Sequence, residues 1–221
     1  MIKAAIFDLD GTLLNRDASV QQFITNQYER LHKWLNHIPE TSYIQRFIEL
    51  DQRGYVWKDK VYKQLIEEFK ITELTWEEML DDYLREFRNS CVPFPHLHQM
   101  LDELKSANIK LGMITNGFGR FQMDNIIALE IKAYFDEILI SEWEGIKKPD
   151  PELFQRALER LNLESSECIF IGDHPQYDVS GAQQVGMKGA WKRDPLWSHA
   201  DHADTVIDEL MELPHYIKAL S

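Results

Sequence analysis

The sequence predicts an α/β fold, in which a doubly wound parallel sheet carries an all-helical domain inserted after its first strand. Apolar runs typical of buried strands alternate with helical patterns in the second half of the chain, which indicates parallel strands joined by helical crossovers. Residues 17–91 instead show apolar residues at helical spacing and no strand pattern. A proline-rich breaker at 93–95 separates the two regions. We therefore expect an α/β core formed by residues 1–15 and 93–221, with a helical cap formed by residues 16–92.

The first strand is expected at residues 2–8, where the apolar run Ala4-Ala5-Ile6-Phe7 leads directly into two acids. Three apolar stripes at helical spacing follow it, so the inserted region is expected to be helical throughout. The stripes are Phe23, Tyr28, Leu31 and Leu35, then Val61, Leu65, Ile66 and Phe69, then Met79, Leu80, Tyr83, Leu84 and Phe87.

Beyond residue 95 the expected elements follow one another as in an open parallel sheet. Asp150 is suited to cap a helix whose first turn contains Pro151. In such a sheet the carboxyl ends of the strands meet at one edge, and active sites lie there. The expected elements are, in order, a helix with Leu97, Leu101 and Leu104 on one face, strands at 110–115 and 137–141, the helix from 151, a strand at 168–172, a helix over 179–185, short strands at 190–191 and 205–207, and a closing helix.

Composition and charge exclude several classes of protein. The net charge of −13 argues against binding nucleic acid through a basic face. No apolar run approaches the roughly 20 residues that span a bilayer, so no membrane partner is expected. Cys91 and Cys168 are far apart in the sequence, and a structural disulfide is not expected. Without a signal-peptide pattern, these features predict a cytoplasmic protein that is a monomer or a small homo-oligomer.

Two acids, Asp8 and Asp10, stand at the end of the first strand. Side chains alternate along a strand, so residues two positions apart point into the same site. Two carboxylates at such a short distance repel each other unless they share a cation or a proton. Oxygen ligands suit Mg²⁺, which makes this pair a candidate magnesium site. The alternative is an acidic turn without metal, for which Gly11 would supply the same conformational freedom.

Three further polar motifs lie where later strands end or helices begin. Thr115 and Asn116 follow an apolar strand, where a hydroxyl and backbone N–H groups are able to hold phosphate oxygens. Lys148 lies in a Lys-Lys-Pro-Asp-Pro segment, and Asp173 and Asp178 follow a later buried strand. Asp173 is a candidate metal ligand, whereas Asp178 would orient Lys148 or a metal-bound water. Taken alone, the Thr115 motif also fits a common turn, the Lys148 motif a pair of solvated lysines, and Asp178 a helix-capping acid. Because the strand ends converge at one edge of the sheet, the motifs together predict one crevice.

These four motifs, in this order, resemble those of the haloacid dehalogenase-like hydrolases, most of which are Mg²⁺-dependent phosphatases, and the resemblance covers nearly the whole chain. It implies that Asp8 is a nucleophile that forms an aspartyl-phosphate. It implies that Asp10 protonates the leaving alcohol, activates water, and offers its backbone carbonyl to the metal. It also implies that the functional lysine is the one before proline, Lys148. The ligands of Mg²⁺ would be Asp8, Asp10 and Asp173, and the groups that bind phosphate would be Thr115, Asn116 and Lys148.

The function expected from these residues is a Mg²⁺-dependent phosphomonoesterase that acts on a small phosphorylated metabolite, with the helical cap excluding water and selecting the substrate. Nucleoside monophosphates, phosphoglycolate and sugar phosphates all remain open. A sugar phosphomutase shares all four motifs and stays an alternative. A 2-haloacid dehalogenase needs no metal and no second acid, so Asp10 disfavours it. A receiver-type phospho-accepting module, which is not an enzyme, has roughly 120 residues and needs no helical insertion.

Two weaker signals lie outside the four motifs. Arg53 and Lys58 stand near Gly54 in the inserted region, where either would contact the distal part of a substrate or would simply be a solvated cation. His199 and His202 alternate with aspartates at a spacing that suits a metal, although a solvated loop is the favoured interpretation.

Overall fold

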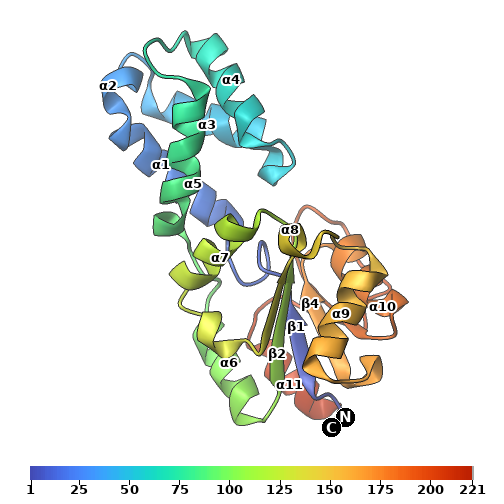
Figure 1. Ribbon diagram of the computed structural model, residues 1–221. Helices are drawn as coiled ribbons and strands as arrows, with labels where there is room; N and C mark the ends of the chain where they lie inside the picture. Colours follow the sequence, from blue (N-terminus) through green and yellow to red (C-terminus); the bar gives the residue numbers. More distant parts are fainter. Residues whose placement is uncertain (221) are drawn as a thin grey trace. The chain divides into compact units, whose positions relative to one another are not determined.

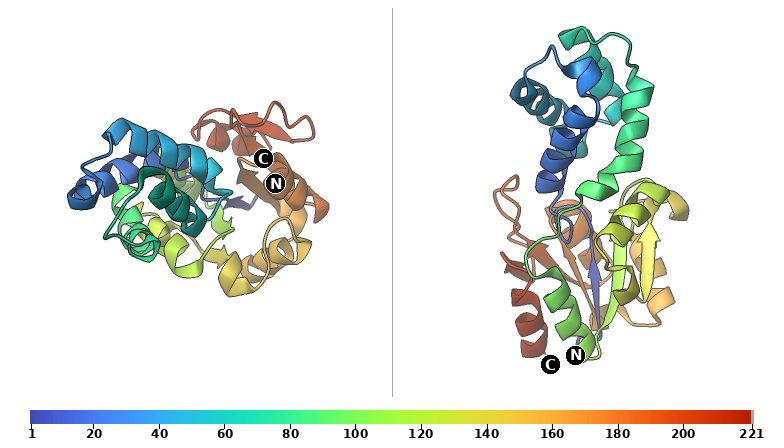
Figure 2. Two further views of the ribbon diagram at one scale, coloured as in Figure 1. Left: turned by 90° about the horizontal axis from the view of Figure 1, so that it is seen from above. Right: turned by 90° about the vertical axis from the view of Figure 1, so that its left-hand side faces the viewer.

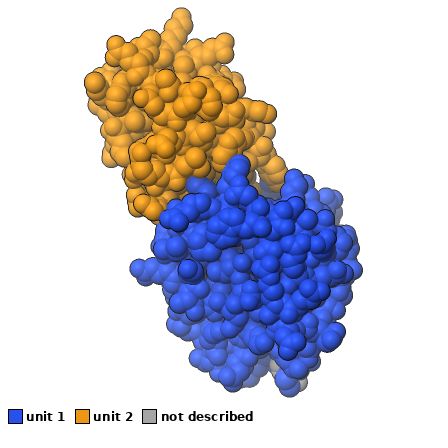
Figure 3. All heavy atoms as spheres, in the orientation of Figure 1, with its two compact units in different colours: residues 1–15, 93–221 blue, residues 16–92 orange. Residues whose placement is uncertain are grey.

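The computed structural model describes residues 1–220, which divide into two compact units (Figures 1 and 3). Residues 1–15 and those from 93 onward form an α/β unit, and residues 16–92 form a helical unit. None of the helices within residues 1–220 has the length and apolar character needed to span a membrane.

The α/β unit contains a six-stranded sheet whose neighbouring strands are all parallel. Its strands are β1 (Ala4–Phe7), β2 (Lys110–Thr115), β3 (Glu137–Ile140), β4 (Cys168–Gly172), β5 (Lys188–Lys192) and β6 (Thr205–Ile207). The order across the sheet is β3-β2-β1-β4-β5-β6, so the chain runs outward from β1 in both directions. This order confirms the doubly wound α/β fold predicted from the sequence. In the register of the sheet, Ala4 lies opposite both Lys110 and Cys168.

Helices cover both faces of this sheet (Figure 2). They are α6 (Leu97–Ser106), α7 (Gly119–Ala128), α8 (Ser141–Glu144), α9 (Pro151–Leu161), α10 (Gly181–Gln184) and α11 (Glu212–Ala219). On one face α9 packs against β4, where the rings of Phe154 and Phe170 lie 5.2 Å apart. On the other face α6 and α11 lie side by side. Because both faces are covered, every residue of β1 and β4 is buried, which explains their continuous apolar runs.

Several elements of the α/β unit differ from the sequence prediction, among them α7 and α8, which were not expected. The helix expected over 179–185 is instead a π-helical turn at Pro175–Ser180 followed by α10. The turn begins earlier because Nδ1 of His174 accepts hydrogen bonds from the N–H groups of Gln176 and Tyr177, at 3.1 and 3.2 Å. In addition, β5 starts two residues earlier than expected, because its first residues pair with β4.

The helical unit has no strand within residues 16–92, in agreement with its sequence pattern. Its helices are α1 (Arg16–Arg30), α2 (His32–Leu35), α3 (Glu40–Asp51), α4 (Lys58–Phe69) and α5 (Trp76–Glu86). Phe23 and Met79 are fully buried, as members of the expected apolar stripes should be, whereas Leu84 is 40% exposed and lies outside the core. At the start of α5, Thr75 and Glu78 each accept a hydrogen bond from the other's backbone N–H, which stabilises this helix end.

Candidate active site

The candidate site lies at the carboxyl edge of the sheet, where segments far apart in the sequence meet. Asp8 follows β1, Thr115 ends β2, Asp173 follows β4, and Lys148 lies in the loop before α9. The N–H of Asp8 donates to the carbonyl of Ile171 at 2.9 Å, so β1 and β4 stay paired up to the site. This edge is where open parallel sheets place their active sites.

A buried lysine joins two of the acids. Nζ of Lys148 lies 2.6 Å from Oδ1 of Asp8 and 2.7 Å from Oδ1 of Asp178, and its side chain is only 3% exposed. The second oxygen of Asp178 accepts a hydrogen bond from the N–H of His174 at 3.0 Å. Both oxygens of Asp178 are therefore engaged, and this residue is placed to orient Lys148.

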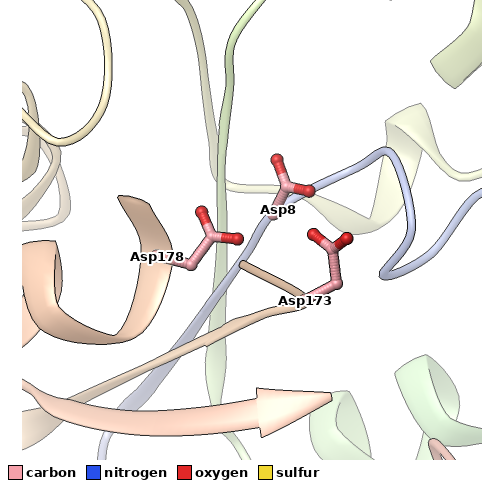
Figure 4. A group of neighbouring side chains, drawn as sticks. All are labelled: Asp8, Asp173 and Asp178. Carbon is pink, nitrogen blue, oxygen red and sulfur yellow. The ribbon is translucent and has the colours of Figure 1, made fainter. Parts of the chain in front are cut away.

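Three carboxylates form a compact group (Figure 4). Oxygens of Asp8, Asp173 and Asp178 all lie within 4.8 Å of one another. Two glycines make room for this group, because a Cβ on Gly11 would lie 2.4 Å from Oδ2 of Asp173, and a Cβ on Gly172 would lie 2.3 Å from Oδ2 of Asp178. When all three acids are ionised, the single ammonium of Lys148 leaves an excess of negative charge in this group. Their oxygens are the donor set that a hard divalent cation prefers.

The pKa values of these groups follow from burial and from mutual repulsion. Burial raises the pKa of Asp8 to about 7, and the charge of Asp178 adds to this while Lys148 opposes it. Burial also raises the pKa of Asp173 to about 9, with further contributions from Asp178 and Asp8. Burial alone would lower the pKa of Lys148, but the charges of Asp178 and Asp8 outweigh it and raise that pKa above its usual range. A bound divalent cation would lower the pKa of both Asp8 and Asp173.

Asp10 is separate from this group of carboxylates. Its Oδ2 accepts a hydrogen bond of 2.7 Å from Nε2 of Gln122, a residue of α7 that is 2% exposed. Nε2 of Gln122 also lies 2.7 Å from Oγ1 of Thr115. The carboxylate of Asp10 is therefore engaged by α7 and lies outside the group of three aspartates, so its backbone carbonyl is the candidate metal ligand implied by the family resemblance. The sequence analysis missed Gln122, because a lone glutamine on a helix has no distinctive spacing.

The two expected phosphate-binding residues have different surroundings. The hydroxyl of Thr115 is buried beside Gln122. The side-chain amide of Asn116 instead pairs with the backbone of Lys148, accepting from its N–H at 2.9 Å and donating to its carbonyl at 3.1 Å. The side chain of Asn116 thus positions the lysine loop, and the binding of phosphate by Asn116 stays a prediction. The backbone N–H of Asn116 is left as the candidate donor to a phosphate oxygen.

The two cations expected to contact substrate are paired inside the helical unit. Arg53 donates to Asp17 at 3.1 Å. Lys58 is 1% exposed and pairs with Asp51, which also accepts a 2.9 Å hydrogen bond from Arg16. Burial engages the ammonium of Lys58 in this ion pair, and contact of Arg53 or Lys58 with a substrate stays a prediction.

The histidines near the C-terminus do not form a metal site. Nε2 of His202 lies 2.9 Å from Oγ of Ser180, and Nδ1 of His199 lies 2.8 Å from Oγ of Ser198. Within the described part of the chain, the three aspartates are the one group of side chains with metal-ligand spacing. The interpretation of His199 and His202 as parts of a loop therefore holds.

Comparison with known proteins gives matches along the whole chain. A family model described as haloacid dehalogenase-like hydrolase matches residues 5–192. The glyceraldehyde 3-phosphate phosphatase of Methanocaldococcus jannaschii is 30% identical, and the alignment covers 100% of this chain and 99% of that protein.

Two solved structures share the fold at similar levels of identity. A phosphatase from Thermococcus onnurineus is 26% identical with a TM-score of 0.68, and 98% of each chain is covered. A 2-haloacid dehalogenase from Pseudomonas syringae pv. tomato is 25% identical, also with a TM-score of 0.68, and 100% of each chain is covered. Since both kinds of enzyme match equally well, the site residues must decide between them.

Proposed function

The chain belongs to the haloacid dehalogenase-like hydrolases, and on this premise we propose that it is a Mg²⁺-dependent phosphomonoesterase that hydrolyses a small phosphorylated metabolite through an aspartyl-phosphate on Asp8. The observation that carries the proposal is the buried ammonium of Lys148, which joins Asp8 to Asp178 beside the carboxylate of Asp173. Chemistry on a phosphate dianion needs this concentration of oxygen ligands and positive charge.

Asp8 is placed to act as the nucleophile. Lys148 holds Oδ1 of Asp8, whereas Oδ2 has no hydrogen-bond partner within residues 1–220. Attack by this oxygen forms a bond to phosphorus and breaks the bond to the leaving oxygen, which takes its proton from Asp10. Asp10 then removes a proton from water, and the water attacks the aspartyl-phosphate to release inorganic phosphate and free Asp8.

The remaining residues neutralise and position charge. Lys148 offsets the repulsion between Asp8 and the incoming phosphate, and Thr115 with the backbone N–H of Asn116 would donate to phosphate oxygens. Mg²⁺ would be held by Asp8, Asp173 and the carbonyl of Asp10, and it would supply the positive charge that keeps the acids ionised and neutralises the substrate.

The alternatives are disfavoured to different degrees. A dehalogenase does not need an acid to protonate its leaving group, whereas this chain holds Asp10 in a defined position through Gln122. A phosphomutase shares the same residues and remains the second candidate. The phosphatase name of the 30% identical relative supports hydrolysis of a small phosphorylated metabolite. The role of the helical unit as a cap stays a prediction.

The test is an assay of phosphate release from a panel of phosphorylated metabolites and from 4-nitrophenyl phosphate. Activity should require Mg²⁺, disappear in EDTA and return when Mg²⁺ is restored. Asp8→Asn should remove turnover, whereas the matched control Asp201→Asn, at an exposed position, should not change it. Chloride release from 2-chloropropionate in EDTA would favour a dehalogenase, and isomerisation of a sugar phosphate without phosphate release would favour a mutase. An Asp8→Asn protein with full activity would contradict the covalent mechanism.

A further inference from the structure

Gln122 connects two parts of the site, the carboxylate of Asp10 and the hydroxyl of Thr115. Its Nε2 lies 2.7 Å from Oδ2 of Asp10 and 2.7 Å from Oγ1 of Thr115, with a longer contact of 3.4 Å to the carbonyl of Asn116. The residue is 2% exposed, so water does not compete for these hydrogen bonds. The carboxamide thus bridges the carboxylate that follows β1 and the hydroxyl that ends β2.

We propose that Gln122 is a positioning residue that fixes the carboxylate of Asp10 for proton transfer to the leaving oxygen and ties it to Thr115. This inference rests on the proposed phosphatase function. It assigns Gln122 no contact with the reacting atoms, because Gln122 acts through Asp10.

The orientation of the carboxamide is determined by its surroundings. Oε1 of Gln122 accepts a hydrogen bond of 3.3 Å from Nδ2 of Asn125, one turn further along α7. The nitrogen of Gln122 must therefore face Asp10 and Thr115, where its two N–H groups find two acceptors. The stem of Gln122 passes close to Gly117, where an added Cβ would lie 2.8 Å from Cγ of Gln122. Glycine at this position allows the side chain to reach the site.

The chemistry of an amide suits this task. A carboxamide donates hydrogen bonds but neither gains nor loses a proton at ordinary pH, so it orients Asp10 without competing for the proton that Asp10 transfers. The bond occupies Oδ2 of Asp10 and leaves Oδ1, which has no hydrogen-bond partner within residues 1–220, to exchange that proton. A general acid must be held within hydrogen-bonding distance of its target, and such positioning affects catalysis strongly.

The test separates proton transfer from general damage by varying the leaving group. A nitrophenolate leaves without much help from an acid, whereas an alkoxide requires protonation. The measured quantity is kcat/KM for 4-nitrophenyl phosphate and for methyl phosphate, because kcat/KM reports the steps up to transfer of the phosphoryl group to Asp8. Gln122→Met keeps the length of the side chain and removes both donors, and Gln122→Glu keeps its size and replaces them with acceptors.

Since general acid catalysis contributes about 10²–10⁴-fold, both variants should lose about 10-fold or more on methyl phosphate. On 4-nitrophenyl phosphate both variants should lose several-fold less. The ratio of kcat/KM for the two substrates should therefore change in the same direction as in a reference variant, Asp10→Asn. The exposed residue Gln155 supplies the control, Gln155→Met, which should keep the wild-type ratio. An equal loss on both substrates would overturn the proposal, because it would indicate a purely structural role.

Two outcomes remain distinct from each other. If wild-type protein hydrolyses neither phosphate ester, the proposed function fails. If wild type is active and the Gln122 variants keep its substrate ratio, the function stands and the role of Gln122 is refuted. Should Gln122→Met fail to fold, Gln122→Glu decides by the same ratio. Gly117→Ala supplies a third variant, since the added Cβ displaces the stem of Gln122 and should shift the ratio in the same direction.

Discussion

Replacing Lys148 by methionine should damage both the stability and the activity of the protein. The side chain is 3% exposed and contacts Asp8 at 2.6 Å and Asp178 at 2.7 Å, so the substitution leaves two buried carboxylates without their shared cation. Removing one partner of a buried ion pair costs about 3–5 kcal/mol. Protonation of Asp8, whose pKa is already raised to about 7, limits the cost at lower pH. We therefore expect a loss of about 3–5 kcal/mol at pH 8 without Mg²⁺.

The assay is urea unfolding at pH 8 in EDTA, with phosphate release measured in Mg²⁺. The adjacent residue supplies a matched control, because Lys147 is exposed, and Lys147→Met should change the free energy of unfolding by less than about 0.5 kcal/mol. Loss of a cation that faces the transferred phosphoryl group should lower kcat by about 10²-fold or more. If Lys148→Met matched Lys147→Met in stability and kept most of the activity, the assignment of Lys148 would be refuted.

Two further predictions concern charge in each unit. In EDTA the free energy of unfolding should fall as pH rises from about 4 to about 9, because the folded pKa values of Asp8 and Asp173 are raised to about 7 and about 9, so the folded state binds more protons than the unfolded state. Urea midpoints measured across this pH range should show the decline. Addition of Mg²⁺, or the substitution Asp173→Asn, should make the decline smaller. A midpoint that rises with pH in EDTA would contradict the prediction. In the helical unit, Asp51→Asn should cost about 3 kcal/mol or more, since it removes the buried carboxylate that pairs with both Lys58 and Arg16. Asp17→Asn, which removes the exposed partner of Arg53, should cost less than about 1 kcal/mol; equal effects of the two substitutions in thermal unfolding would show that burial of the Asp51 pair is unimportant.

The central strands were predictable because their signal is local. Residues 4–7, 111–114 and 168–172 are apolar along their whole length, as strands covered on both faces must be. The turn at Pro175–Ser180 was not predictable in this way, because it depends on the direction of one histidine ring. The extra length of β5 was also not predictable from local sequence, because it comes from pairing with β4, a strand elsewhere in the sequence.

In the candidate site, too, some features follow from local sequence and others from packing. Asp8, Lys148 and Asp173 were identified from motifs at strand ends and loop starts, and the structure brings them together. No local pattern indicated that Asn116 would pair with the backbone of the lysine loop, or that Lys58 would be buried against Asp51. Both partners depend on how separate segments pack.

The sequence by itself determined which chemical groups stand at the carboxyl edge of a doubly wound sheet, because strand periodicity and turn residues act over a few positions. Only the tertiary structure decided which oxygens of those groups remain available. It directs Asp10 toward Gln122, gives both oxygens of Asp178 to other donors, and leaves Oδ2 of Asp8 open. The physical reason is that a hydrogen bond depends on the distance and angle between two groups, and packing sets both; Asp10 and Gln122, for example, are 112 residues apart in the sequence.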